Sequence, residues 1–242
     1  MLVHGCNSPP GQLASLAGVF EAHGQQTVCF SYDDRERLEA SAERFVAALE
    51  LLKAHLTSRR IVVLGHSQGG LIARRALVRD RAQGLREDDG FRYELVTVSS
   101  PFHGIDSSAD CGSVALRVIT LGITVGVCRM VAGAMWSEIY PRSSFMRRPG
   151  TLLSSVQRHV NVVTDERATC RRRDLAGNCL KSDFVFSLAE QYAPLVDDDT
   201  RAQSTEIRAG HVEIVGQGGN PPQKLIRLLQ EERILAAQTM TR

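Results

Sequence analysis

The pattern in this chain best suited to catalysis is a serine between glycines, in the run Gly65-His66-Ser67-Gln68-Gly69. It follows a continuous apolar run typical of a buried parallel strand and precedes a helical pattern. The glycines permit a tight turn, and the first N–H groups of the helix would stabilise a developing oxyanion. A turn of this kind can be purely structural, but the strand, turn and helix order favours Ser67 as a nucleophile.

A serine nucleophile requires a general base and an acid that orients the base, because the hydroxyl is weakly nucleophilic at its ordinary pKa. The chain has 7 histidines. His211 lies just past the last expected strand. We therefore predict His211 as the base. His103, in the loop after an earlier strand, is the alternative.

The elements that must position these residues alternate between strands and helices. Hydrophobic periodicity predicts strands at 2–3, 26–32, 61–64, 93–98, 159–164 and 205–208, and helices at 11–23, 38–52, 71–77 and 222–237. This order predicts a single α/β domain over residues 1–242, with a mostly parallel sheet and helices on both faces. In such sheets, ligands bind at the carboxyl ends of the strands.

Beyond the serine turn, the chain resembles the α/β-hydrolase fold, and more narrowly bacterial lipases and PGAP1-like (GPI-inositol-deacylase-like) serine esterases. Leu2-Val3-His4-Gly5 resembles the family's oxyanion strand. Ser99-Ser100-Pro101-Phe102-His103-Gly104 resembles the strand-ending segment before the lipase lid, and Ser182-Asp183-Phe184-Val185-Phe186-Ser187 is similar to the segment that supplies the acid. The resemblance covers nearly the whole chain.

The resemblance implies the remaining roles. It implies Asp183 as the acid, with Asp165, which directly follows the strand at 160–164, as the alternative. It implies an oxyanion hole made by the backbone N–H groups of Gln68 and Cys6, with Asn7 as the alternative to Cys6.

These roles predict a serine carboxylic-ester hydrolase that acts through an acyl-enzyme on an ester with an apolar acyl group. No metal or cofactor is required. Relatives of the PGAP1-like type suggest two alternatives, acyl transfer to an alcohol and deacylation of a lipid-anchored glycan. An alternative of a different class is a catalytically silent hydrolase fold that serves as a binding module.

Residues 103–149 form an insertion whose segment 114–136 is too apolar for an exposed loop. As a pair of helices, it would cover Ser67 like a lipase lid and present apolar surface to an acyl chain or a membrane interface. An ordinary buried helical pair, or a short re-entrant segment, is the alternative. Arg117 and Arg129 leave an uncharged core too short for a simple bilayer crossing.

The composition limits the partners. The 242 residues are 43% hydrophobic, which is normal for one soluble globular domain. A net charge of +2, from 29 basic and 27 acidic residues, gives no concentrated basic face for nucleic acid. The expected partner is therefore an acyl ester or a lipid.

The 6 cysteines give conflicting indications of the compartment. Cys170 and Cys179 flank a polar loop that a disulfide could close, and Cys111 and Cys128 flank the front of the insertion. Paired cysteines indicate an oxidising compartment, but no signal peptide follows Met1. Either the natural start lies upstream, which indicates a periplasmic or membrane-associated protein, or the cysteines are reduced and buried in a cytoplasmic one.

Overall fold

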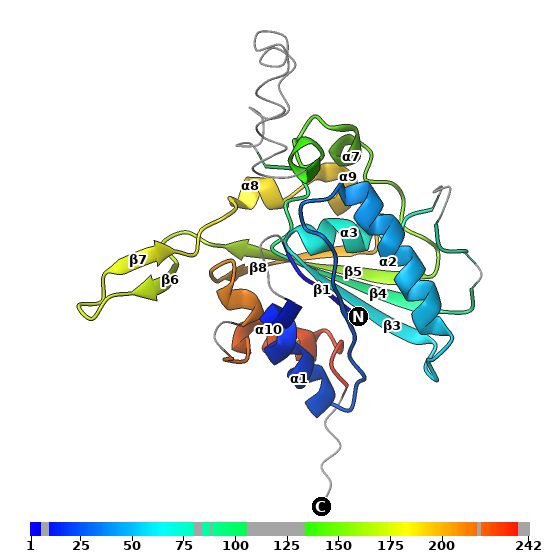
Figure 1. Cartoon of the computed structure of the whole chain (residues 1–242), viewed down its shortest axis with the longest axis horizontal. Helices are drawn as coiled ribbons and strands as arrows, with labels where there is room; N and C mark the ends of the chain where they lie inside the picture. Colours follow the sequence, from blue (N-terminus) through cyan, green and yellow to red (C-terminus); the bar gives the residue numbers. More distant parts are fainter. Residues whose placement is uncertain (6–9, 80–83, 88, 106–133, 217–218, 237–242) are drawn as a thin grey trace, which may run out of the picture.

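A computed structural model describes residues 1–5, 10–79, 84–87, 89–105, 134–216 and 219–236. Its centre is a six-stranded sheet of order β2-β1-β3-β4-β5-β8, in which every neighbouring pair is parallel (Figure 1). The strands are β1 (Leu2–Val3), β2 (Cys29–Phe30), β3 (Arg60–His66), β4 (Arg92–Val98), β5 (Val156–Asp165) and β8 (Ala202–Arg208). The parallel α/β architecture predicted from the sequence is confirmed.

Helices cover both faces of this sheet, as predicted. On one face lie α2 (Leu38–Lys53) and α3 (Gln68–Ala76), and on the other lie α1 (Ala14–Ala22) and α10 (Gln223–Glu231) (Figure 1). Each face has its own apolar core, one around Phe45, Ile72 and Tyr93, the other around Leu16 and Leu229. Burial on both faces explains why β3 and β4 carry nearly continuous apolar runs.

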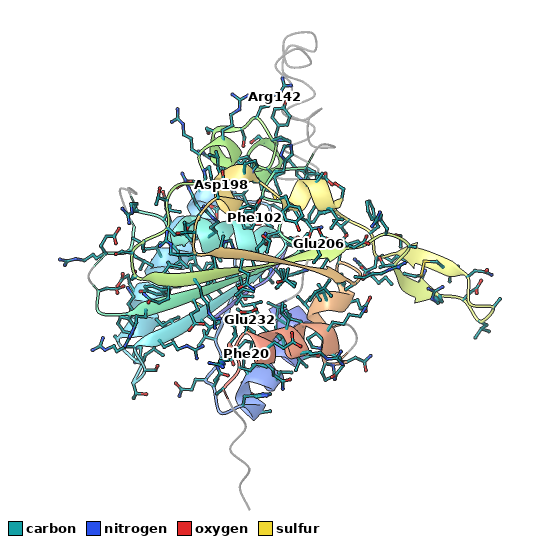
Figure 2. All side chains as sticks on the ribbon, turned by 180° about the vertical axis from the view of Figure 1, so that it is seen from behind. Phe20, Phe102, Arg142, Asp198, Glu206 and Glu232 are labelled. Atoms are coloured by element: carbon teal, nitrogen blue, oxygen red, sulfur yellow. A yellow bond between two sulfur atoms is a disulfide. The ribbon has the colours of Figure 1, made fainter. Side chains whose placement is uncertain are left out.

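Short elements complete the connections. They are η1 (Pro10–Leu13), η3 (Ala134–Ser137), α7 (Ser144–Arg147), α8 (Leu188–Gln191), α9 (Pro194–Asp197) and η4 (Glu213–Val215). A second, antiparallel sheet pairs β6 (Cys170–Arg173) with β7 (Cys179–Ser182). We refer to residues 170–182 as the hairpin arm, because it stands away from the main body (Figures 1 and 2).

Several local expectations differ from the structure. The strand expected at 26–32 is reduced to two residues, because β2 is an edge strand that pairs only with the equally short β1. The segment between Cys170 and Cys179, expected to be a polar loop, includes paired strands. The last helix, predicted over 222–237, ends at Glu231.

Residues 106–133 lie outside the described residues. They include most of the insertion and most of its apolar segment. The predictions of a lid and of membrane contact through 114–136 therefore remain predictions. Among the described residues, no helix combines the length and apolar character that a bilayer crossing requires.

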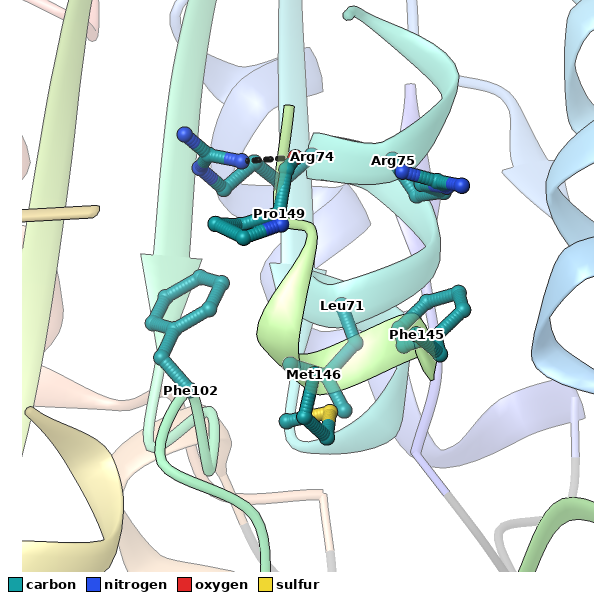
Figure 3. A pocket seen from close by; sticks show the side chains of 7 residues that line it. All are labelled: Leu71, Arg74, Arg75, Phe102, Phe145, Met146 and Pro149. Atoms are coloured by element: carbon teal, nitrogen blue, oxygen red, sulfur yellow. Dashed lines mark hydrogen bonds between the residues drawn. The ribbon is translucent and has the colours of Figure 1, made fainter. Parts of the chain in front are cut away.

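Helix α3, which follows the serine turn, is held by hydrogen bonds to the segment at 149–150, at the end of the insertion (Figure 3). Burial lowers the pKa of Arg74 to about 10, and its guanidinium donates to the carbonyl oxygens of Pro149 (2.6 Å) and Gly150 (3.1 Å). A hollow of about 20 Å³ remains beside it, lined by Leu71, Arg74, Arg75, Phe102, Phe145, Met146 and Pro149. This volume accommodates about one water molecule, so the contact is structural and is not a ligand site.

Candidate active site

Four polar side chains meet at the carboxyl edge of the sheet. Ser67 follows β3, Ser99 follows β4, Glu166 follows β5, and His211 lies shortly after β8. All four are buried. Because neighbouring strands are parallel, their carboxyl ends lie side by side, and residues far apart in sequence converge there.

The turn that carries Ser67 is strained. Ser67 has φ 57° and ψ −128°, a conformation unfavourable for a residue with a side chain. Its N–H donates to the carbonyl of Val98 (2.8 Å), which anchors the turn to β4. A Cβ on Gly65 or Gly69 would lie within 3 Å of backbone atoms, so the close approach of strand and helix requires glycine at both positions.

Ser67 opens into a cavity of about 290 Å³. Its polar lining includes Ser67, Gln68, His66, His211 and Arg171. The other lining residues are Gly5, Ile105, Met135, Trp136, Ile139, Val185, Phe186 and Val212. The structure thus brings together Ser67, Gln68 and His211 in a cavity whose walls are largely apolar.

The backbone after β1 approaches the serine closely. A Cβ on Gly5 would lie 2.8 Å from the Cβ of Ser67. The preceding His4 stacks on Tyr32, and the Tyr32 hydroxyl donates to the His4 carbonyl (2.8 Å), which fixes this segment. Cys6 and Asn7, the predicted and alternative oxyanion donors, lie outside the described residues.

The imidazole of His211 is held by a carboxylate. Its Nδ1 lies 2.9 Å from Glu166 Oε1 and 2.8 Å from Ser99 Oγ. An ionised carboxylate only accepts hydrogen bonds, so this network assigns the proton of the neutral imidazole tautomer to Nδ1 and makes Nε2 its acceptor nitrogen. The ring of Phe186 packs edge-on against the imidazole at 4.9 Å between centroids. His211 is therefore oriented as a general base requires.

Both oxygens of Glu166 are satisfied. Besides His211, Oε1 accepts from the hydroxyls of Ser99 (2.7 Å) and Thr164 (3.0 Å), and Oε2 accepts from the N–H groups of Val185 and Phe186. Burial raises the pKa of this carboxyl, but the hydrogen bond and charge of His211 and the neighbouring donors outweigh it. The net pKa lies below its usual value, so Glu166 stays ionised.

Asp183, the predicted acid, makes none of its hydrogen bonds to the His211 ring. Its carboxylate accepts from Arg171 Nε (2.9 Å) and Nη2 (2.7 Å) and from the backbone N–H groups of Val212 and Glu213. Its own carbonyl accepts the N–H of His211 (2.9 Å). Asp183 therefore holds the backbone that carries His211, whereas Glu166 contacts the imidazole.

Glycine at position 210 makes this arrangement possible. A Cβ there would lie 2.7 Å from the Cβ of Asp183 and would overlap its carboxylate. With no side chain at this position, the carboxylate packs directly beneath the loop that follows β8. In this position it accepts hydrogen bonds from backbone N–H groups and from Arg171.

The two alternatives that the sequence left open are not at the site. Asp165 forms a two-pronged pair with the exposed Arg167, whose hydrogen bonds lower the pKa of Asp165 to about 2. His103 is exposed, does not line the cavity, and donates its N–H to the carbonyl of Glu190. Neither contacts His211.

The motif that resembles the family's acid segment contains an aspartate, so Glu166 was not among the residues predicted from the sequence. β5 extends one residue further than predicted, to Asp165, so the first residue beyond the strand is Glu166. An acidic residue just beyond the strand that precedes the histidine was the available signal, since glutamate can serve as the acid in this chain order.

His66 supports the same loop. It lies in the interior, and its Nε2 is 2.9 Å from the carbonyl oxygen of His211. Burial, followed by the proximity of His211, lowers the pKa of His66 well below its usual value. A neutral His66 then donates from Nε2 to that carbonyl.

The predicted disulfide between Cys170 and Cys179 is present and joins β6 to β7. Among the described residues Cys29 is a free, exposed thiol. The pairing of Cys111 with Cys128 falls outside the described residues.

No protein-family model matches this sequence, and no curated protein sequence matches it. Solved structures do. A Bacillus licheniformis lipase in its mature form matches with a TM-score of 0.63 and 12% identity, over 98% of this chain and 91% of that one. The chain has the α/β-hydrolase fold.

Two further solved structures agree with this fold. A monoacylglycerol lipase from Paleococcus ferrophilus matches with a TM-score of 0.55 and 13% identity, over 96% of this chain and 91% of that one. A putative cell surface hydrolase from Lactobacillus plantarum matches with a TM-score of 0.53 and 12% identity, over 98% of this chain and 91% of that one. At these identities the α/β-hydrolase likeness establishes the fold alone, and the narrower resemblance to PGAP1-like esterases stays a prediction.

Proposed function

We propose that this α/β-hydrolase is a serine hydrolase of carboxylic esters. The observation that carries the proposal is the shared placement of three groups. Ser67 lies on a strained turn and shares a cavity with His211, whose Nδ1 is held by Glu166. A nucleophile, a base and an ion that orients the base are the parts that acyl transfer requires.

In the first half of the reaction, His211 Nε2 removes the proton of Ser67 Oγ as this oxygen attacks the ester carbonyl. The C–O bond of the leaving alcohol then breaks, and His211 returns the proton to the alcohol oxygen. In the second half, water loses a proton to His211 and attacks the acyl-enzyme. The bond between the acyl carbon and Ser67 Oγ then breaks, His211 returns the proton to Ser67 Oγ, and the acid is released. Because its pKa is lowered, Glu166 remains a carboxylate and stabilises the imidazolium that forms in both halves.

The charge that develops on the carbonyl oxygen requires hydrogen-bond donors. Gln68 is the first residue of α3, and the N–H groups of the first helix turn have no partner within the helix. The N–H of Cys6 is the proposed second donor, following from the sequence resemblance. The backbone of Gly5, the residue before Cys6, lies close to the Ser67 side chain, which supports this proposal.

The apolar lining of the cavity favours an apolar acyl group, so the proposed substrate is an acyl ester or lipid. The names of the matched proteins are in keeping with acyl chemistry: lipase, monoacylglycerol lipase and, with a TM-score of 0.50 and 14% identity, a thioesterase from a Streptomyces coelicolor prodiginine pathway. None of the proposed steps uses a metal or cofactor.

Labelling by a fluorophosphonate probe tests this proposal. We expect the wild-type chain to be labelled and to hydrolyse p-nitrophenyl esters within a series from acetate to palmitate, and Ser67→Ala to lose both while remaining folded. A wild-type chain that is neither labelled nor active would instead support the silent binding module. Product analysis with an added alcohol separates hydrolysis from acyl transfer.

A further inference from the structure

The hairpin arm has no core of its own. Every residue from 175 to 182 is exposed, and the arm extends into solvent from the main sheet (Figures 1 and 2). An isolated two-stranded hairpin is marginally stable in water. Here the Cys170–Cys179 disulfide joins its strands, so the chain keeps an exposed and otherwise unstable element in one shape.

Apolar side chains are concentrated on this arm and at its base. Leu175, in the turn at the tip, is fully exposed at 109%, and Leu180 on β7 is 57% exposed. Phe184 and Val185, just beyond the arm, are 48% and 43% exposed. These are four of the seven exposed large apolar side chains in the described part of the chain, so the concentration is specific to this region.

The stem of the arm is basic. Arg172, Arg173 and Lys181 are exposed, and the strand register places Arg172 directly opposite Lys181. Like charges opposed across a ladder destabilise it, unless an anion lies against both. The acidic residue near the tip, Asp174, accepts hydrogen bonds from Asn178 within the turn and does not lie across from these cations.

We propose that the hairpin arm docks on an anionic lipid surface. Leu175 enters the boundary between headgroups and acyl chains, while Arg172, Arg173 and Lys181 contact lipid phosphates. The lengths agree, because three strand residues span about 10 Å and interfacial side chains bury about 5–10 Å deep. An apolar tip above a cationic stem fits a bilayer better than a nucleic acid, which offers no apolar layer for Leu175.

The arm also leads to the candidate active site. Arg171 at the start of the arm and Val185 just past its end both line the Ser67 cavity. The arm therefore connects the proposed lipid contact to the wall of that cavity. The proposal is independent of the predicted contact through 114–136 and does not require that the protein be an enzyme.

Vesicle co-sedimentation of the full chain tests the proposal, with phosphatidylcholine vesicles that contain or lack phosphatidylserine. We expect binding to the phosphatidylserine vesicles, little binding to neutral ones, and weaker binding as salt rises. Removing two cations in the Arg172→Gln, Lys181→Gln variant should lower partitioning about 25-fold, about fivefold per charge. Leu175→Ser should lower it about tenfold.

Two controls make substitutions of the same kind elsewhere on the surface, the loss of one cation and the loss of one exposed leucine. Arg92→Gln alters an exposed cation at the amino end of β4, and Leu51→Ser alters a 72% exposed leucine on α2. Both should bind vesicles as the wild type does. Loss of binding by the controls equal to that of the arm variants would overturn the proposal, as would a wild type that ignores phosphatidylserine.

Two more measurements distinguish lipid docking from a protein contact and from a loss of catalysis. If the arm variants changed only the oligomeric mass in lipid-free solution and not vesicle binding, the arm would be a protein contact and the proposal would fail. Ser67→Ala should bind vesicles normally, so loss of turnover and loss of docking are independent results. In the absence of lipid, the arm variants should hydrolyse a soluble ester at the wild-type rate.

Discussion

Two buried carboxylates flank the loop of His211 and contact different parts of it. Glu166 and Asp183 are each 1% exposed, and each accepts hydrogen bonds on both oxygens. Glu166 contacts the imidazole, whereas Asp183 contacts the backbone N–H groups of the loop. Burial and proximity to the histidine therefore do not distinguish the two carboxylates, and we propose Glu166 as the acid because it contacts the imidazole.

The partners of the two groups also differ in charge. Asp183 is paired with Arg171, a guanidinium that stays charged throughout any proton transfer. Glu166 is paired with an imidazole that gains a charge only when it takes a proton. In our account, only Glu166 can therefore stabilise a charge that appears during the reaction, and Asp183 stabilises the folded loop.

The largest expected effect is that of Glu166→Gln on turnover. The N–H groups of Val185 and Phe186 donate to Oε2, so glutamine would place its carbonyl oxygen there and its NH2 group against Nδ1. That NH2 group favours the wrong imidazole tautomer and does not stabilise an imidazolium, so kcat should fall about 10³- to 10⁴-fold. Steady-state kinetics on a soluble ester measures this. The neighbouring Asp165→Asn is the matched control and should keep wild-type kinetics, because its partner is the exposed Arg167. A small effect of Glu166→Gln would remove the distinction between the two carboxylates.

The corresponding change at Asp183 should act on stability. Asp183→Asn removes the negative charge that pairs with Arg171. It also weakens the hydrogen bonds that the backbone N–H groups of Val212 and Glu213 donate to this side chain. We expect the free energy of unfolding to fall by about 1–3 kcal/mol and kcat to fall about tenfold or less. Urea unfolding and kinetics on the same preparation separate these quantities. A loss of turnover as large as that of Glu166→Gln, at unchanged stability, would contradict the account.

A smaller effect is expected at Ser99, whose hydroxyl bridges the base and its acid. Ser99→Ala removes one neutral hydrogen-bonding group worth about 1 kcal/mol, which corresponds to about a fivefold loss of kcat. KM should stay unchanged, because Ser99 does not line the cavity. An effect on KM alone would show that this hydroxyl acts on substrate binding and not on His211.

The smallest effect concerns stability at acid pH. The pKa of Glu166 is lower in the folded than in the unfolded chain, so its ionised form stabilises the fold above about pH 4.3. That contribution is lost as pH falls through the lowered folded pKa. The stability difference between wild type and Glu166→Gln should thus be constant near neutrality and shrink below about pH 4. Urea titrations from neutral to acid pH measure it; a difference that grows toward acid pH would contradict the stated pKa direction.

Much of this arrangement could be predicted from the sequence, for physical reasons. The apolar runs of β3, β4 and β5 are strong signals because both faces of those strands are buried. Gly65 is required by the turn itself, and Gly69 by the backbone of Val3 and His4. The serine between its glycines could still be recognised from the short-range pattern.

The acid and the hairpin arm depend on longer-range contacts. Which carboxylate reaches Nδ1 is decided by where β8 delivers His211 relative to the end of β5, and pairing across strands is not visible in spacing. The match around Asp183 located a residue close to the histidine in space but not in contact with its ring. The strands of the arm carry charged side chains and depend on a disulfide, so no apolar alternation marks them.

The most direct test of the central claim is the proton NMR signal of the His211 Nδ1–H. A proton held between an imidazole and a carboxylate is strongly deshielded, so wild type should show a far-downfield resonance. We predict that this resonance is retained in Asp183→Asn and shifts upfield or disappears in Glu166→Gln. The reverse pattern, loss in Asp183→Asn and retention in Glu166→Gln, would show that Asp183 is the partner of the imidazole and would contradict the account.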